Sequence, residues 1–172
     1  INPNNSLEFF YKVNNSYAEY DGYANDFTPL DSPNNYTNKS QDFAYLKYKF
    51  NLFNNSFNNE ILLAGGSSTR NYHEPNDDDT IPNDYDFNSH NQQLKYNAFY
   101  IANNNFNLNG GFNMENNKAL VADLYGVQNP QNTLSTNMYF TMQEYLNPYT
   151  FLEQGLSKVF FQHDNAVNTQ FD

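Results

Sequence analysis

Three segments of the chain alternate between apolar and other residues with a period of two. The clearest is 43–53, and the pattern returns over 94–102 and 134–146. Successive side chains of a β-strand point to opposite faces, so a period of two over this length predicts long, half-buried strands. Shorter strands are expected over three further ranges: 7–13, 61–64 and 119–127.

Two dipeptides carry the sequence signal of a tight hairpin turn. Asn109-Gly110 lies between alternating apolar residues, and a type I′ turn needs positive φ at both central positions, which Asn and Gly adopt readily. Asp21-Gly22 predicts a second hairpin with weaker flanking strands. Short asparagine runs such as 103–105 are expected to form turns.

One segment near the end of the chain has helical features. Residues Thr150–Glu153 match a capping box, and Leu152, Leu156 and Val159 follow at helical spacing. These features predict a short helix over about 151–162. The alternative is a C-terminal strand that ends in Val159-Phe160-Phe161.

The rest of the chain is expected to be irregular. The stretches 25–41 and 65–92 are rich in Asn, Asp and Ser and contain prolines, which is typical of long binding loops or contacts with neighbouring molecules. We therefore expect a mostly β fold over residues 1–172. It would be a single antiparallel β-sandwich or jelly-roll-like domain with long loops and the one C-terminal helix.

Composition limits the partners of the chain. Asparagine makes up 34 of its 172 residues, Tyr and Phe add 31, and the net charge is −11. With Arg70 as the only arginine, nucleic acid and anionic membrane surfaces are not expected partners, because both need clustered Lys and Arg. The absence of cysteine excludes disulfides and thiolate sites.

The first residue and the overall composition indicate a secreted protein. The chain starts at Ile1 and not at an initiator methionine, and removal of a signal peptide is the simplest explanation. Low lysine with high Asn, Tyr and Thr fits an extracellular or cell-surface location. The alternative is a domain cut from a longer chain.

The acidic segment 73–86 is the best metal-site hypothesis. Closely spaced carboxylates and Asn carbonyls can supply the six to eight oxygens that Ca²⁺ prefers, although the spacing is not that of an EF-hand. The alternative is a solvated acidic loop without a cation. The pair His73 and His90 is a weaker zinc signal. The expected calcium ligands are Glu74, Asp77, Asp79, Asp84 and Asp86.

No motif of the sequence predicts an enzyme or a cofactor. Ser67, Ser68 and Thr69 follow two glycines but do not form a nucleophile elbow. The three histidines are scattered, and no pair of glutamates is selected by spacing for glycoside hydrolysis. We therefore expect a non-enzymatic protein.

Two further sets of residues suggest contact with sugars. Tyrosines at strand spacing could stack on pyranose rings, although packing in a β core or a subunit interface is the favoured interpretation; these are Tyr45, Tyr48, Tyr96 and Tyr100. Five N-x-S/T sequons, no more than chance predicts, would accept glycans in a glycosylating host; they start at Asn4, Asn14, Asn35, Asn38 and Asn54.

The function expected from these features is structural. The chain would be a subunit of an extracellular filament, sheath or shell that binds copies of itself by strand addition. Residues 1–13, especially 7–13, and the tail after Phe161 are the expected donor segments. The alternative is a carbohydrate-binding or lectin-like module, assisted by Ca²⁺. A small outer-membrane β-barrel is the third hypothesis, because alternating strands also suit that fold.

Overall fold

The computed structural model shows an all-β chain. It describes residues 5–19, 22–23, 29–30, 35–74, 83–122, 128–147, 149–163 and 166–171. Across these ranges there is no helix of the length and hydropathy needed to cross a membrane.

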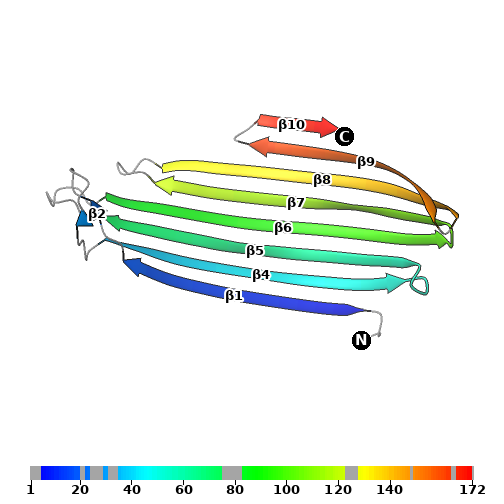
Figure 1. Ribbon diagram of the computed structural model, residues 1–172, viewed down its shortest axis with the longest axis horizontal. Helices are drawn as coiled ribbons and strands as arrows, with labels where there is room; N and C mark the ends of the chain where they lie inside the picture. The colour runs from blue at the N-terminus through cyan, green and yellow to red at the C-terminus, as the bar shows by residue number, and fades with distance from the viewer. Residues whose placement is uncertain are drawn as a thin grey trace.

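One open antiparallel sheet holds eight strands, seven of them long (Figure 1). Each strand pairs with the one that follows it in the sheet, so the chain runs up and down across the sheet without a crossover. A separate pair joins β2 (Gly22–Tyr23) to β3 (Pro29–Leu30). In sheet order the eight strands are β1 (Ser6–Glu19), β4 (Tyr36–Leu52), β5 (Phe57–Glu74), β6 (Asn83–Asn103), β7 (Phe106–Ala122), β8 (Gln128–Asn147), β9 (Thr150–His163) and β10 (Ala166–Phe171).

The strands predicted from alternation are confirmed. The segments 43–53, 94–102 and 134–146 lie almost entirely in β4, β6 and β8. The shorter candidates 7–13 and 61–64 lie inside β1 and β5. Of 119–127, the first four residues end β7, and 123–127 lie outside the described residues.

The helix predicted over about 151–162 is wrong, because this segment is strand β9. Its residues pair one to one with β8 from Thr150 to His163, with an irregularity near Tyr145. A capping box fixes only the first helical turn. The ladder of hydrogen bonds to β8 runs along the whole segment, and this pairing overrides a local signal.

The hairpin predicted at Asn109-Gly110 is also wrong. Both residues lie inside β7, where they pair with Phe99 and Ala98 of β6. The turn between β6 and β7 falls instead at 104–105, within the asparagine run, as expected of that run. For the other hairpin, Asp21 lies outside the described residues, and Gly22 belongs to β2.

Where the two stretches expected to be irregular are described, they are almost entirely strand; residues 25–28, 31–34 and 75–82 lie outside the described residues. Residues 36–41 open β4, 65–74 complete β5 and 83–92 begin β6. Their alternation is hidden because polar side chains occupy both faces at this end of the sheet. One face carries Ser67, Thr69 and Asn71, and the other carries Ser68 and Arg70.

A two-layer sandwich or jelly roll is not confirmed, because the described strands form one open layer. No hydrophobic side chain among the described residues is fully buried, and Asn35 and Asn59 are the only buried polar ones among them. The accessible surface is 12391 Å², whereas a compact monomer of 20.0 kDa exposes about 8700 Å² by the usual scaling. The sheet therefore leaves apolar surface uncovered that a compact domain would bury.

Asparagine side chains build the short turns at one end of the sheet. In the 53–56 turn, Asn54 and Asn55 have positive φ of 55° and 71°, a region that Asn tolerates better than most residues. At the next two turns an asparagine side chain accepts a hydrogen bond from the backbone N–H two residues later, at 2.8 Å for Asn103 and 2.9 Å for Asn147. Three connections on the opposite side, 20–35, 75–82 and 123–127, are longer, whereas β9 and β10 are joined on that side by residues 164–165 alone.

Candidate functional site

The two faces of the sheet differ in chemistry. Directly paired residues share a face, so the register assigns each side chain to one of two sets. The apolar face carries the even-numbered residues of β4 and β6 to β9 and the odd-numbered residues of β1 and β5. The polar face carries the others.

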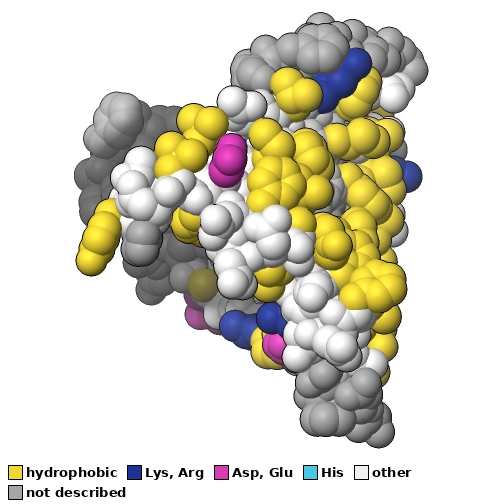
Figure 2. Space-filling view, turned by 90° about the vertical axis from the view of Figure 1, so that its right-hand side faces the viewer, with side chains coloured by type: hydrophobic (Ala, Val, Ile, Leu, Met, Phe, Trp, Pro, Cys, Tyr) yellow, Lys and Arg dark blue, Asp and Glu magenta, His cyan; other side chains and the backbone are white. Residues whose placement is uncertain are grey.

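A continuous apolar band crosses all seven long strands on the apolar face. It consists of four neighbouring rows of paired positions, which in β4 run from Leu46 to Leu52, and Ala44 extends the band in that strand. Figure 2, which looks along the strands from their short-turn end, shows hydrophobic side chains gathered along one side of the molecule. The main members are Leu7, Phe9, Leu46, Tyr48, Phe50, Leu52, Phe57, Ile61, Leu63, Leu94, Tyr96, Tyr100, Leu108, Phe112, Met114, Met138, Phe140, Met142, Leu156 and Phe160.

Many side chains of the apolar band are exposed. Phe9 is 70% exposed, Met138 51% and Leu156 74%. Exposed apolar patches larger than a few hundred Å² mark a surface that another molecule or a membrane covers. We therefore expect the apolar band to be covered by another molecule or by lipid.

Asn59 and Lys158, two polar side chains inside the apolar band, have partners within the sheet. Asn59 is only 4% exposed, accepts a hydrogen bond from the Tyr96 hydroxyl at 2.7 Å and donates to the Phe57 carbonyl at 3.3 Å. Lys158 is the one charged residue in the four rows, and its ammonium lies 4.5 Å from the centre of the Phe160 ring. The band therefore presents little unpaired polarity to its surroundings.

The polar face is joined by hydrogen bonds and ion pairs between neighbouring strands. Both described salt bridges lie on it: Glu8 with Lys47 at 3.4 Å, and Lys49 with Glu60 at 3.3 Å. Amide side chains link β6 to β7 and β8 to β9 in the same way. These pairs are Gln93 with Glu115 at 3.0 Å, Asn91 with Asn117, and Gln143 with Glu153 at 3.2 Å.

Beyond the apolar band, most side chains of β4 and β5 are polar on both faces. On the apolar side there, Ser67 donates a hydrogen bond to Asp42, and Ser40 donates to Asn15 at 2.8 Å. Desolvation, followed by the hydrogen bond to Glu19 at 3.0 Å, raises the pKa of the Tyr17 hydroxyl. The apolar band thus has a polar boundary at the end of the sheet with the long connections.

A tyrosine spans three strands of the polar face above Gly111. Gly111 pairs with Asn97 of β6 and Tyr139 of β8. Because Gly111 has no side chain, the Tyr139 hydroxyl reaches across it and donates to the Asn97 side-chain oxygen at 2.7 Å. This contact explains why residue 111, in the middle of β7, is a glycine.

Replacing Tyr139 by phenylalanine is expected to lower the free energy of unfolding by about 0.5–1.5 kcal/mol, the usual value of one hydrogen bond. Denaturant titration measures it. Asn97→Ala and the double variant complete a mutant cycle, which isolates the pair. If the two single losses add fully in the double variant, the hydroxyl and the amide are not coupled.

The expected calcium ligands are not brought together by the described residues. Asp77 and Asp79 lie outside the described residues, and only the backbone of Glu74 and Asp84 is described. Asp86 is exposed on the apolar face of β6. Within the described part, no three His, Asp or Glu side chains are grouped to hold a metal, so the calcium site stays a prediction.

The four tyrosines expected to stack on sugars do not form one platform. Tyr48 and Tyr96 share a row of the apolar band through Ile61, and Tyr100 lies two rows away. Tyr45 lies on the polar face, where its hydroxyl donates to Glu8.

The sequons are spread over different environments. Asn14 lies on the polar face and Asn38 on the apolar face, and Asn35 is only 4% exposed. Asn54 is exposed in the 53–56 turn, and Asn4 lies outside the described residues. The donor segment 7–13 is already paired with β4 of its own chain.

Sequence reasoning missed the apolar band as a single surface. The alternation of each strand is visible in the sequence, but only the register shows that the apolar sets of seven strands fall on the same face. The signal is present in the unusual length of alternation over 94–102 and 134–146.

Known proteins supply no function for this chain. Comparison with protein-family models, with curated proteins and with solved structures finds no match. The function must therefore be argued from the two faces of the sheet.

Proposed function

We propose that this chain forms part of the wall of a transmembrane β-barrel, with the apolar band facing lipid and the polar face lining the interior. The observation that carries the proposal is the apolar band itself, continuous over seven strands and backed by a hydrogen-bonded polar face. Membrane barrels have this same arrangement of an apolar outside and a polar inside.

The dimensions of the sheet support the proposal. A membrane-spanning strand needs about 9–11 residues, which matches the run of the apolar band in β4 from Ala44 to Leu52. The strands continue beyond the band at the polar end, as in barrels whose strands extend out of the bilayer. Short turns at one end and longer connections at the other are also typical of this class.

The sheet has open edges, which a barrel wall would have to close. In lipid every backbone N–H and C=O must be paired, so a spanning sheet must close. β1 pairs with β4 on one side and with no described strand on the other. A closed wall therefore requires that the two edges pair with each other or with additional strands.

The test uses the absence of tryptophan from the chain. Phe112→Trp places a single fluorophore in the apolar band, and Lys95→Trp places one on the polar face of the neighbouring strand. In phospholipid vesicles, lipids brominated on their chains are expected to quench the Phe112→Trp variant strongly and the Lys95→Trp variant weakly. Aqueous acrylamide is expected to show the reverse order. Equal quenching of the two variants by brominated lipid would contradict the proposal.

The second candidate is a subunit of an extracellular assembly that grows by strand addition. The free edge of β1 supports it, because an unpaired edge strand is a ready template for another chain. The same two variants separate the candidates. Polymers in lipid-free buffer, with the fluorophore of the Phe112→Trp variant shielded from acrylamide and no partition into vesicles, would favour the assembly.

A further inference from the structure

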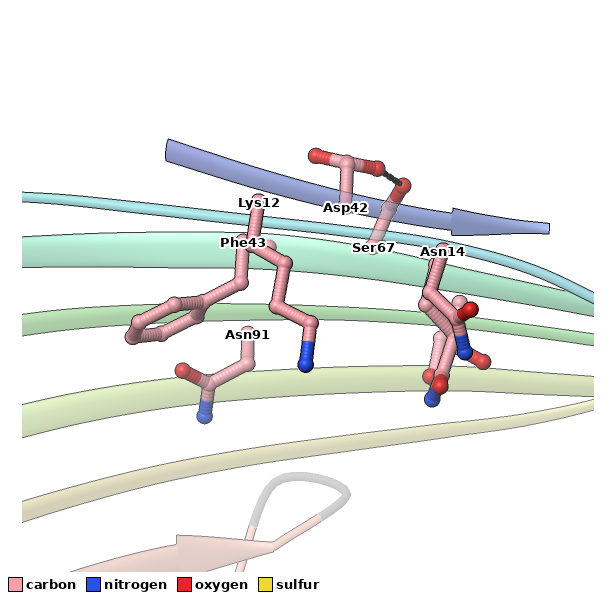
Figure 3. Close-up of a pocket in the computed structure, with 10 residues that line it drawn as sticks. Lys12, Asn14, Asp42, Phe43, Ser67 and Asn91 are labelled. Carbon is pink, nitrogen blue, oxygen red and sulfur yellow. Dashed lines mark hydrogen bonds between the residues drawn. The ribbon is translucent and has the colours of Figure 1, made fainter. Parts of the chain in front are cut away.

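A hollow of about 360 Å³ lies on the polar face above Gly66. Gly66 pairs with Phe43 on one side and with Asn91 on the other, and Lys12 pairs with Phe43. Because Gly66 has no side chain, the floor of the hollow is backbone. Figure 3 shows Lys12, Phe43 and Asn91 projecting to the same side of the sheet, with Asp42 on the opposite side.

Phe43 is the aromatic residue that lines the hollow, and further rings lie next to it outside the lining. Phe43 is 42% exposed and Phe10 40% exposed, and both lie on the polar face, which also carries Leu62 and Phe99. The ring centres of Phe10 and Phe43 are 6.4 Å apart, and Tyr45 stacks on Phe10 at 5.3 Å. The Phe43 ring is tilted by 55° against Phe10, so Phe43 alone offers a flat ring face next to the hydrogen-bonding groups of the hollow, which is the composition of a small-molecule site.

The other groups around the hollow are polar, and one carries a free charge. Among the described residues, Lys47 and Lys49 have carboxylate partners, whereas no described acid pairs with Lys12. The amides of Asn14 and Gln41 also line the hollow. The set therefore combines a flat ring, several amides and one ammonium group. The Asp42 carboxylate, also in the lining, projects to the other side of the sheet and accepts a hydrogen bond from Ser67 there.

We propose that this hollow binds an acidic pyranose sugar. The apolar face of the sugar ring stacks on Phe43, the ring hydroxyls bond to the amides, and the sugar carboxylate pairs with the Lys12 ammonium. A charged hydrogen bond of this kind is stronger than a neutral one, so the acid is preferred over the neutral sugar. The site does not depend on the membrane proposal, although in a barrel wall it would face the interior.

Binding of glucuronate and of glucose, which share the ring and differ in the carboxylate, tests the site. NMR titration of the detergent-solubilised chain is expected to show tighter binding of glucuronate. Lys12→Gln is expected to weaken glucuronate about tenfold and to leave glucose unchanged, as loss of one charged contact would. Phe43→Leu is expected to weaken both sugars.

Lys95→Gln is the matched control, because it removes a cation from the same face outside the hollow. It is expected to leave both affinities unchanged. Equal losses of glucuronate affinity in the Lys12 and Lys95 variants would overturn the proposal, since they would indicate attraction to the whole face. No binding of either sugar at millimolar concentration would overturn it as well. Circular dichroism confirms that each variant keeps its β-sheet, and lipid quenching decides the membrane proposal separately.

Discussion

Replacing Leu94 by arginine is expected to destabilise the chain in a bilayer by about 2–4 kcal/mol, the cost of a guanidinium at the lipid-facing midplane of a barrel. Leu94 lies in the apolar band, directly between Leu63 and Met114. An arginine there would place its charge among apolar neighbours without a carboxylate in the same row. Denaturant unfolding from phospholipid vesicles measures the loss.

The adjacent residue supplies the control. Gln93 lies on the polar face, where its amide donates to Asn113 at 2.9 Å and to Glu115 at 3.0 Å. Gln93→Arg keeps donors in that position and adds a pairing with the Glu115 carboxylate, so stability is expected to change by less than about 1 kcal/mol. A similar loss in both variants would mean that lipid does not cover the apolar face.

The strands could be predicted from the sequence, whereas their assembly into one layer could not. Alternation over 43–53, 94–102 and 134–146 depends only on the direction of neighbouring side chains, and it locates β4, β6 and β8. A sandwich and a single layer need the same alternation in each strand. They differ in what covers the apolar face, and this information is not contained in any one segment.

The errors of detail have a shared physical cause. At Asn109-Gly110 and at 151–162, local preferences for a turn and a helix give way to pairing with neighbouring strands. The sequence wrongly predicts loops at the polar ends of β5 and β6. The alternation of apolar and polar residues disappears there because polar side chains occupy both faces. For the hollow above Gly66, the ammonium group comes from β1 and the aromatic ring from β4, and only the register brings Lys12 next to Phe43.

A substitution at Gly111 tests the register in which β7 pairs with β6 and β8. A Cβ at this position would collide with the Tyr96 carbonyl oxygen and would lie 3.0 Å from the Tyr139 hydroxyl. Gly111→Ala is therefore expected to cost about 1–3 kcal/mol, as other overpacked substitutions do. It should also break the hydrogen bond between Tyr139 and Asn97, so adding Tyr139→Phe should cause little further loss.

The preceding glycine provides the comparison within one dipeptide. At Gly110 the nearest atoms to an added Cβ, from Phe140 and Tyr139, are 3.4 Å away, which is an ordinary contact. Gly110→Ala is expected to be neutral or to stabilise by up to about 1 kcal/mol, because alanine loses less backbone entropy than glycine in a strand. If the segment were instead the Asn-Gly turn of a hairpin, Gly110 would need positive φ and its replacement would be the more damaging one. The order of the two losses in a denaturant titration therefore decides between an uninterrupted β7 and a hairpin at this point of the chain.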